Sequence, residues 1–172
     1  MVVWLIGLSG AGKSTLARAV CDLARRRLDN LVLLDGDQVR EVFGGDLGHG
    51  LADRRRNAER ICRLCRLLDQ QGIHVVCAIL SMFEESRQWN RGHYSDYYEV
   101  FIDTPLELLQ ARDPKGLYRL AREQGLTDVP GLDLPFPRPQ SPDLVIDNRQ
   151  GLEALLSHAP AIAARLTGGG PP

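Results

Sequence analysis

Short apolar runs alternate with stretches of helical periodicity along most of the chain. The runs are rich in aliphatic and β-branched side chains, which predicts buried strands. They lie at residues 2–6, 31–34, 75–80, 97–102 and 144–146. The predicted helices cover residues 13–27, 53–71, 106–111 and 152–166. Strands that alternate with helices in this way predict an α/β fold, in which a parallel β-sheet is flanked by helices on both faces.

One long segment interrupts this alternation. Residues 112–139 are rich in glycine, proline and charged side chains and are longer than a simple connection. Segments of this kind are usually functional loops or lids. Because 172 residues suit one compact domain, we expect a single domain over residues 1–167, with a lid at about 112–139. Residues 168–172 are expected to form a flexible tail.

Composition narrows the classes of partner. The chain has 21 basic and 22 acidic side chains and a net charge of -1, so it has no general attraction for a nucleic acid polymer or a membrane surface. No apolar run approaches the ~20 residues of a membrane span. Cys62 and Cys65 have a C-x-x-C spacing, but neither a second pair nor a nearby histidine completes a zinc site. Buried free thiols indicate a reducing compartment, and we expect a cytoplasmic protein.

The loop after the first predicted strand matches the pattern G-x-x-x-x-G-K-[ST] in full. Its glycines let backbone N–H groups point at phosphate oxygens, and the helix that follows adds the positive end of its dipole. Lys13 is expected to reach the β- and γ-phosphates of ATP, and Ser14 is expected to ligate Mg²⁺. The predicted ATP-phosphate ligands are Gly7, Ser9, Gly10, Ala11, Gly12, Lys13, Ser14 and Thr15.

A phosphate loop occurs in several classes of protein, and two of them do not fit this chain. The N-K-x-D guanine reader of switch GTPases is absent from the sequence. The chain is also shorter than a typical motor or transporter ATPase with accessory domains. A small-molecule kinase fits this size, and kinases of this kind close a lid over their substrates.

Two carboxylates, Asp35 and Asp37, follow the second predicted strand, at the sheet edge where ligands approach open parallel sheets. Beside a phosphate site, one carboxylate can hold Mg²⁺ or its waters, and the other can accept the proton of an attacking hydroxyl. Capping of the next helix is the simpler role for either residue alone. The predicted metal ligands are Ser14 and Asp35. The predicted catalytic residues at this stage are Lys13, Asp35 and Asp37.

Basic side chains follow these carboxylates along the chain. Arg54 and Asn57 are three residues apart and share one helix face. Arg40 lies one helical turn beyond Asp37. The planar fork of an arginine suits phosphate or sulfate oxygens, so these residues are candidates for binding an anionic acceptor. A solvated basic helix is the alternative, because further arginines surround Arg54.

Several motifs together resemble one family, adenylylsulfate kinase, which phosphorylates the 3′-hydroxyl of adenosine 5′-phosphosulfate (APS) with MgATP. The resemblance extends from residue 3 to about residue 147. The motifs lie at residues 7–15, 34–40, 46–48, 53–57, 101–105 and 112–118. The resemblance implies a P-loop NTPase fold, ATP and APS as the bound nucleotides, and a homodimer.

The resemblance also implies roles for individual residues. Asp37 corresponds to the general base, and Lys115 brings the charge of the lid over the phosphates. Ser81 matches a serine that the family assigns to the active site, which adds it to the catalytic set. We expect it to be a substrate contact or a helix cap, because in-line transfer requires positioning and charge neutralisation and no covalent relay. The implied acceptor-binding residues are Arg40, His49, Arg54, Asn57, Leu80, Ser81, Lys115 and Val129.

Three positions depart from the family pattern. His49 and Val129 replace two phenylalanines that are expected to sandwich the adenine of APS, and Glu84 replaces an arginine. Stacking on an aromatic ring contributes ~1–3 kcal/mol per base. Loss of both rings would cost ~2–6 kcal/mol, or roughly 30-fold to 10⁴-fold in affinity. Glu84 is expected to add an anion near an anionic substrate.

These departures leave the acceptor open. Drift with local compensation would keep APS as the acceptor. A changed acceptor would be a different nucleotide, such as the cytidine diphosphoramidate that a branch resembling these kinases phosphorylates in capsule polysaccharide biosynthesis. A non-catalytic nucleotide-binding module is a third hypothesis. It would predict damage at Lys13, Ser14 or Asp37, and all three residues are intact.

Overall fold

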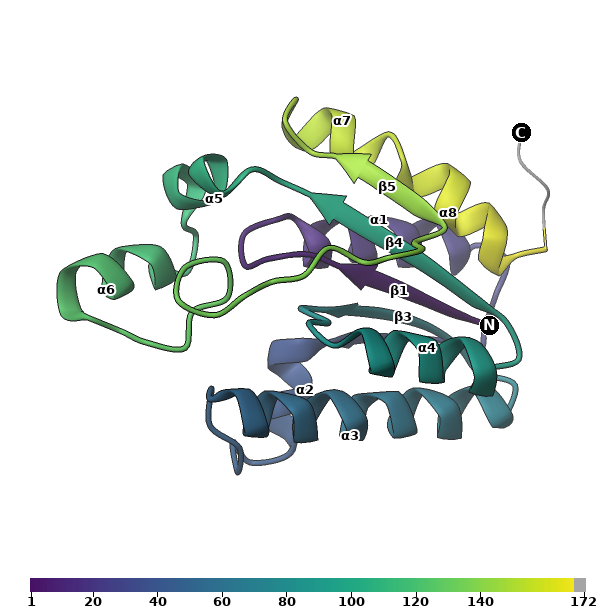
Figure 1. The fold of residues 1–172 in the computed structure, drawn as a ribbon. Coiled ribbons are helices and arrows are strands. Elements are labelled where there is room, and N and C mark those ends of the chain that lie inside the picture. The colour runs from purple at the N-terminus through teal and green to yellow at the C-terminus, as the bar shows by residue number, and fades with distance from the viewer. Residues whose placement is uncertain (169–172) are drawn as a thin grey trace.

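A five-stranded parallel β-sheet forms the centre of the computed structural model, which describes residues 1–168 (Figure 1). Its strands are β1 (Val2–Ile6), β2 (Leu31–Asp35), β3 (His74–Ile79), β4 (Tyr97–Asp103) and β5 (Leu144–Asp147). Their order across the sheet is β2-β3-β1-β4-β5, and each neighbouring pair runs parallel. The predicted α/β fold with a parallel sheet is confirmed.

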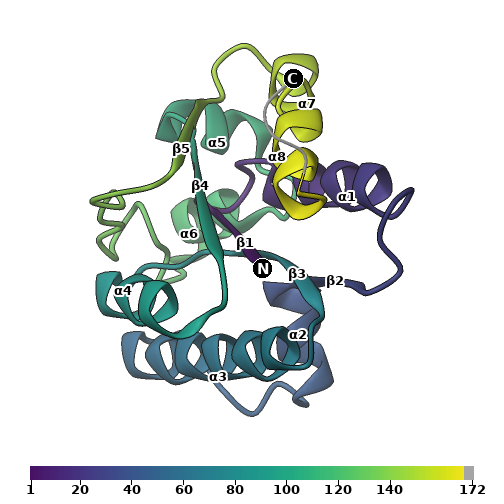
Figure 2. The ribbon, with the colours of Figure 1, turned by 90° about the vertical axis from the view of Figure 1, so that its right-hand side faces the viewer.

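Helices cover both faces of this sheet (Figure 2). α1, α7 and α8 pack on one face, whereas α2, α3 and α4 pack on the other. α5 and α6 lie beyond the carboxyl ends of the strands (Figure 1). The helices are α1 (Lys13–Ala24), α2 (Gly36–Val42), α3 (Leu51–Gln70), α4 (Glu84–His93), α5 (Leu106–Arg112), α6 (Leu117–Gln124), α7 (Leu152–Leu156) and α8 (Ala159–Leu166).

β1 occupies the middle of the sheet because neither of its faces is polar. Val3 and Leu5 point into the core beneath α1 and α8. Trp4 and Ile6 point into the opposite core, where they meet apolar side chains of α3. A strand that is apolar on both faces must be covered on both sides. The carboxyl end of β1, where the phosphate loop begins, is therefore held rigidly between two packed layers.

The structure differs from the predicted elements at four places. Hydrophobic periodicity predicts none of α2, α4 and α6. α2 has only seven residues, which is too short for a clear periodicity. The buried residues of α4 are Arg87 and Asn90, so this helix has no apolar stripe that a hydrophobic pattern could reveal. The helix predicted over residues 152–166 is two helices, α7 and α8. Pro160 in the first turn of α8 lacks an N–H donor and cannot continue α7.

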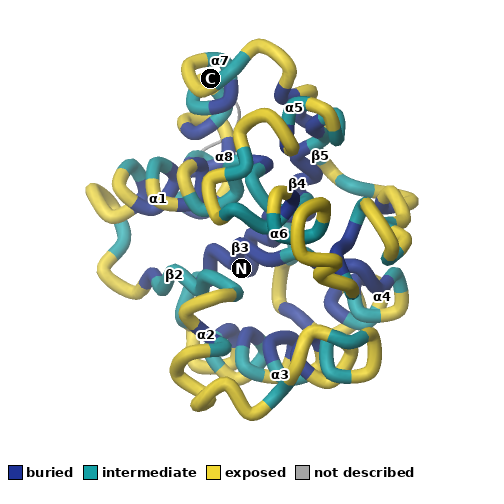
Figure 3. The backbone as a smooth tube through the Cα atoms, turned by 90° about the vertical axis from the view of Figure 1, so that its left-hand side faces the viewer, coloured by how far each residue is buried: buried dark blue, intermediate teal, exposed yellow. Residues whose placement is uncertain are grey.

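The predicted lid segment contains α6 and an irregular stretch that returns to β5. Figure 3 shows exposed stretches in this segment and in the outer loops, whereas β3 and β4 are mostly buried. Among residues 1–168, none of the helices combines the length and the apolar character that a membrane span requires. The predicted tail falls mostly on residues 169–172, which lie outside the described part of the chain.

Candidate active site

The phosphate loop joins the end of β1 to α1 and depends on glycine for its shape. Gly10 and Gly12 have φ angles of 80° and 90°, which side chains with a Cβ rarely adopt. A Cβ on Gly12 would also lie 2.5 Å from Leu155 Cδ2. Gly12 forms the N-cap of α1. The loop therefore presents backbone N–H groups at a helix N-terminus, which is the arrangement that binds phosphate.

Two side chains that sequence reasoning missed hold this loop in place. Asn148 Nδ2 donates to the carbonyl oxygen of Ala11 (3.0 Å), and the Tyr118 hydroxyl donates to that of Ser9 (3.1 Å). Asn148 directly follows β5, and parallel strands end at the same edge of the sheet. Its position in the sequence was therefore the only sign that it could lie near the phosphate loop. Tyr118 belongs to α6 and lies in the lid motif.

Lys13 reaches back across the loop, and its Nζ donates to the carbonyl oxygen of Leu8 (2.8 Å). Burial, together with the nearby Lys115 charge, lowers the pKa of Lys13 to about 8, although Asp37 and Asp35 oppose the shift. Burial disfavours the charged form, and a nearby anion favours it. The geometry places this ammonium where the negative charge of a triphosphate would stabilise it.

Ser14 and Asp35 lie side by side, and the Ser14 hydroxyl donates to Asp35 Oδ2. The other oxygen, Asp35 Oδ1, accepts from the backbone N–H of Asp37 (3.0 Å) and caps α2. Hydroxyl and carboxylate oxygens suit Mg²⁺, which keeps several waters and takes its remaining ligands from phosphates. Within the described residues, no cluster of three or more His, Cys, Asp or Glu side chains could hold a metal by itself. The donor set therefore fits Mg²⁺ bound together with a nucleotide.

Asp37 is the first acidic residue of α2 and is paired with the lid. Lys115 Nζ forms an ion pair with Asp37 Oδ2, and both side chains are mostly exposed. The two residues are 78 positions apart. The lid segment thus reaches across the phosphate loop and contacts the carboxylate predicted to be the base.

One hollow of about 430 Å³ joins these groups to the predicted acceptor residues. We call it the main hollow. The predicted site residues along its walls are Ser9, Lys13, Ser14, Asp35, Asp37, His49, Arg54, Leu80, Lys115 and Val129. An adjoining inner hollow of about 120 Å³ has walls that include Asp37, Arg40, His49, Arg54, Asn57, Leu80 and Ser81. The structure thus gathers the predicted donor and acceptor residues into one continuous site. Five predicted phosphate ligands border neither hollow: Gly7, Gly10, Ala11, Gly12 and Thr15, the last of which is exposed on α1.

The inner hollow carries polar atoms that have no partner in the described structure. They are Arg54 Nε and Asn57 Oδ1, both buried. Arg54 Nη2 donates to the carbonyl oxygen of Asp128 (2.9 Å), which ties α3 to the lid. Buried polar groups are nearly always hydrogen-bonded, and an unpaired one is costly. A polar ligand in this hollow would satisfy both atoms.

Arg40 and His49 form the outer rim of the inner hollow. Arg40 Nη1 donates to the carbonyl oxygens of Leu47 and Gly48, each at 3.1 Å, and so shapes the loop that carries His49. Partial burial and the charges of Arg40 and Arg54 lower the pKa of His49 below its usual value. The imidazole is therefore favoured in its neutral form beside these cations.

Ser81 does not cap a helix, so that part of the prediction is wrong. The N-cap of α4 is Phe83, and the Ser81 hydroxyl instead accepts from Trp4 Nε1 (3.0 Å). Glu84 also lies elsewhere than expected. Its carboxylate pairs with Arg87 (2.5 Å), and Glu84 borders neither hollow. It therefore does not oppose an anion in the acceptor site.

Val129 is in the wall of the main hollow but is almost completely buried, with 1% of its surface exposed. Its backbone N–H donates to Asp133 Oδ1 (2.7 Å), and its side chain belongs to the hydrophobic core on the side of the sheet that α1 and α8 cover. The side chain of Val129 is therefore enclosed by neighbouring core residues, and a larger side chain at this position would have to displace them.

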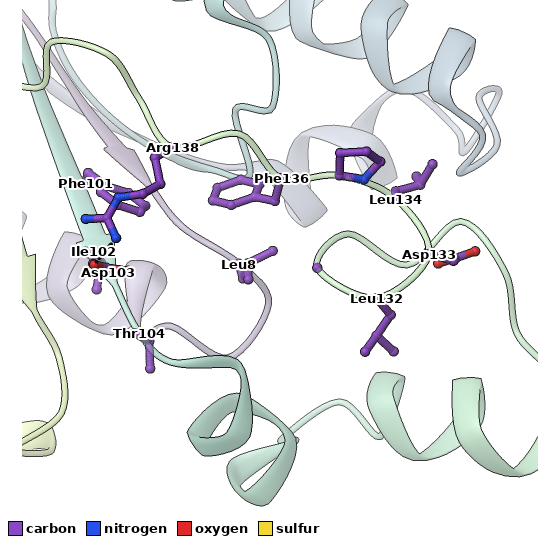
Figure 4. A pocket seen from close by; sticks show the side chains of 12 residues that line it. Leu8, Phe101, Ile102, Asp103, Thr104, Leu132, Asp133, Leu134, Phe136 and Arg138 are labelled. Carbon is purple, nitrogen blue, oxygen red and sulfur yellow. Dashed lines mark ion pairs between the residues drawn. The ribbon is translucent and has the colours of Figure 1, made fainter.

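A separate hollow of about 440 Å³ lies between the end of β4 and the returning lid segment (Figure 4). Leu8, Phe101 and Phe136 contribute to it, and Arg138 pairs with Asp103 (2.8 Å) at its edge. It contains none of the predicted site residues, so it is distinct from the main and inner hollows.

Comparison with known proteins identifies the family. Residues 1–147 match the sequence profile of a family described as adenylylsulphate kinase. The chain belongs to the adenylylsulphate kinase family. It is 41% identical over 156 residues to the adenylyl-sulfate kinase of Geotalea uraniireducens, across 89% of this chain and 75% of that protein. It is 39% identical over 151 residues to a probable adenylyl-sulfate kinase of Bacillus subtilis, across 87% and 77% of the two chains.

Solved structures agree with this assignment. The Mycobacterium tuberculosis APS kinase CysC in complex with AMPPNP and APS superimposes with a TM-score of 0.84 at 36% identity, and the match covers 96% of each chain. Shikimate kinase from Aquifex aeolicus, at 17% identity and a TM-score of 0.51, shares the fold alone. The predicted P-loop kinase fold and the predicted family are confirmed. The alternative acceptor, cytidine diphosphoramidate, is not favoured, because the curated relatives are named as adenylyl-sulfate kinases.

Proposed function

We propose that this chain transfers the γ-phosphoryl group of ATP to the 3′-hydroxyl of APS. The observation that carries the proposal is the main hollow, in which Lys13, Asp37 and Arg54 come together from α1, α2 and α3. One end of this hollow has the features of a phosphate site, and the other has buried polar groups suited to a second nucleotide. A relative with the same fold is described with AMPPNP and APS bound, which supports this pairing of substrates.

On the donor side, the phosphate loop binds the triphosphate through backbone N–H groups and the N-terminus of α1. Lys13 places its ammonium against the β- and γ-phosphates. Ser14 and Asp35 would hold Mg²⁺, which when bound neutralises charge on the phosphate oxygens. The hydroxyl and the carboxylate are adjacent in the structure, where the Ser14 hydroxyl donates to Asp35 Oδ2.

On the acceptor side, Asp37 accepts the proton of the 3′-hydroxyl. The hydroxyl oxygen forms a bond to the γ-phosphorus, and the bond from that phosphorus to the bridging oxygen breaks, which releases ADP. Lys115 pairs with Asp37 in the structure, so it must leave the carboxylate before the proton is transferred. Once Lys115 leaves Asp37, its ammonium can lie near the triphosphate, which is the position that the family resemblance implies for it.

The remaining acceptor contacts follow the walls of the inner hollow. Arg40 and Arg54 provide donors for the phosphosulfate oxygens, and the unpaired Asn57 Oδ1 can accept from a ribose hydroxyl. His49 and Val129 border the space assigned to the adenine, whereas Leu80 and Ser81 form the opposite wall. Because Arg54 Nε and Asn57 Oδ1 are buried and unpaired, the site favours a ligand that forms hydrogen bonds with both atoms.

The proposal extends to the organisation of the whole chain. One kinase domain spans residues 1–167, and residues 112–139 act as a lid that opens and closes over the site. Four buried free thiols support a cytoplasmic location. The family resemblance supports a homodimer, and light scattering on the purified protein measures its mass directly.

A direct assay tests the proposed reaction. Purified protein is incubated with ATP, Mg²⁺ and APS, and ADP is measured by a coupled assay while the nucleotide products are weighed by mass spectrometry. We expect one ADP for each APS molecule that gains a phosphoryl group. Omission of APS and the Lys13→Ala variant are the controls. ADP release that does not depend on APS, or preference for cytidine 5′-diphosphate, would contradict the proposal.

A further inference from the structure

The segment between β3 and α4 forms one wall of the inner hollow. All four of its residues, Leu80, Ser81, Met82 and Phe83, border that hollow. Ser81 has a φ angle of 52°, in the left-handed region that side chains with a Cβ rarely adopt. A backbone held in such a conformation persists only when its surroundings enforce it. The shape of this wall therefore depends on what holds Ser81.

Two buried side chains hold Ser81 from opposite directions. Trp4 Nε1 donates to the serine hydroxyl from β1 (3.0 Å). Arg87 Nη1 donates to the serine carbonyl oxygen from α4 (2.5 Å). Only 1% of Arg87 is exposed, and Arg87 borders neither hollow, so it can act on the acceptor only through this segment. A hydrogen bond from a charged donor is stronger than one between neutral groups.

The guanidinium of Arg87 is itself fixed by two carboxylates. Glu84 Oε2 lies 2.5 Å from Arg87 Nη2, and Glu99 Oε1 lies 3.7 Å from Arg87 Nε. Glu99 is on β4 and is 2% exposed. One cation thus links the sheet, the first turn of α4 and the wall of the inner hollow. This arrangement also gives Glu84 a physical role at the position where the family pattern has an arginine.

We propose that Arg87 is a positioning residue for the acceptor nucleotide. It holds the Ser81 carbonyl, and thereby the path of residues 80–83, in the shape that the acceptor contacts. The phosphate-loop residues Ser9, Lys13 and Ser14 border the main hollow, whereas Ser81, Met82 and Phe83 border only the inner hollow. Loss of Arg87 therefore weakens use of the acceptor and spares use of ATP. The identity of the acceptor in this inference rests on the proposed function.

The conservative variant Arg87→Lys tests the inference, with Arg91→Lys as its matched control. Lysine keeps the charge but has no planar fork to bridge Ser81 and Glu84. Arg91 is on the same helix and also contacts Glu99, but its hydrogen bonds go to Ser141 and Asp143. We expect Arg87→Lys to raise KM for APS about tenfold while KM for ATP stays within about twofold. Arg91→Lys should leave both KM values within about twofold.

Hydrogen–deuterium exchange tests the structural step without reference to any substrate. In protein without added nucleotide, Arg87→Lys should speed exchange in a peptide that covers residues 80–84, and Arg91→Lys should not. Unchanged exchange in that peptide, or equal rises in both KM values, would overturn the inference. If wild-type protein fails to phosphorylate APS, the proposed function is wrong, and the exchange comparison still decides whether Arg87 holds this wall.

A second variant guards against misfolding. Glu84 is at the surface edge of the network, so Glu84→Gln should fold even if Arg87→Lys does not. Glutamine keeps a hydrogen-bond acceptor for Arg87 but removes the charge. We expect a smaller rise in KM for APS, about twofold to fivefold, with faster exchange over residues 80–84. Exchange and KM values identical to wild type in this folded variant would overturn the inference.

Discussion

Replacement of Asn148 by alanine tests how far the phosphate loop depends on a residue from the other end of the chain. Asn148 Nδ2 donates to the carbonyl oxygen of Ala11 (3.0 Å), although the two residues are 137 positions apart. Asn148 is only 2% exposed, so water does not readily replace the lost donor. The variant leaves the carbonyl group of Ala11 buried without this hydrogen bond.

The expected loss of stability follows from the two polar atoms of the amide. A buried acceptor that loses its donor costs ~1–3 kcal/mol. Asn148 Oδ1 has no partner within the described structure, so its removal relieves a penalty of the same kind. The free energy of unfolding should therefore fall by ~1 kcal/mol, at the low end of that range. For a domain of this size, the melting temperature should fall by ~2–4 °C.

The effect on nucleotide use should be selective. Ala11 belongs to the phosphate loop, so a misplaced carbonyl disturbs the backbone N–H groups that bind the triphosphate. We expect KM for ATP to rise ~5-fold, which corresponds to about 1 kcal/mol, while KM for APS stays nearly constant. Steady-state kinetics with each substrate varied in turn, together with thermal melting, measure both effects.

Asn30→Ala is the matched control for this experiment. Asn30 also donates from its side-chain amide to a backbone carbonyl, that of Gly72, but the bond is exposed to solvent. Its loss should change stability by no more than ~0.5 kcal/mol and leave KM for ATP unchanged. If Asn148→Ala behaves like Asn30→Ala in both measurements, the hydrogen bond does not support the phosphate loop and the reasoning is refuted.

Four further variants test the remaining assignments. Lys13→Ala should lower turnover by ~10²-fold or more without lowering the melting temperature, because it removes a buried ammonium; residual activity above about a tenth of wild type would contradict the phosphate-loop assignment. Asp37→Asn should lower kcat by ~10²-fold or more and spare ATP affinity; a collapse of ATP affinity with intact turnover would assign Asp37 to the metal. His49→Phe should lower KM for APS up to ~5-fold through better stacking, and an unchanged KM would contradict this. Val129→Phe should lower the free energy of unfolding by ~1–3 kcal/mol because that position is already packed, and an unchanged melting temperature would contradict this.

The phosphate site could be predicted because its parts are contiguous in the chain. A strand, a glycine-rich turn and a helix follow one another over residues 2–24, and each has a local signature. Asp35 and Asp37 could be added because β2 ends with Asp35, and parallel strands end at the same edge of the sheet even when, as here, β3 lies between β2 and β1. The structure places both carboxylates in the wall of the main hollow, together with Lys13 and Ser14.

Polar helix faces explain where prediction from periodicity was wrong. α4 turns Arg87 and Asn90 inward, and both are buried, so the usual apolar stripe is missing. The arginine is stable there only because Glu84 and Glu99 pair with it. Glu84 belongs to the same helix, whereas Glu99 is on β4, more than ten residues further along the chain. No local sequence pattern predicts that Glu99 pairs with Arg87.

The sequence by itself determined the order of the five strands in the chain, the phosphate loop and the family. Only the tertiary structure decided which distant residues support that site. Asn148 and Tyr118 reach the phosphate loop across 137 and 109 positions, and Lys115 reaches Asp37 across 78. No sequence pattern predicts a hydrogen bond between a side chain and a distant backbone carbonyl. Such a bond depends on how the sheet and the lid bring the two groups together. Local patterns record which face of an element is buried, and tertiary packing decides what that face meets.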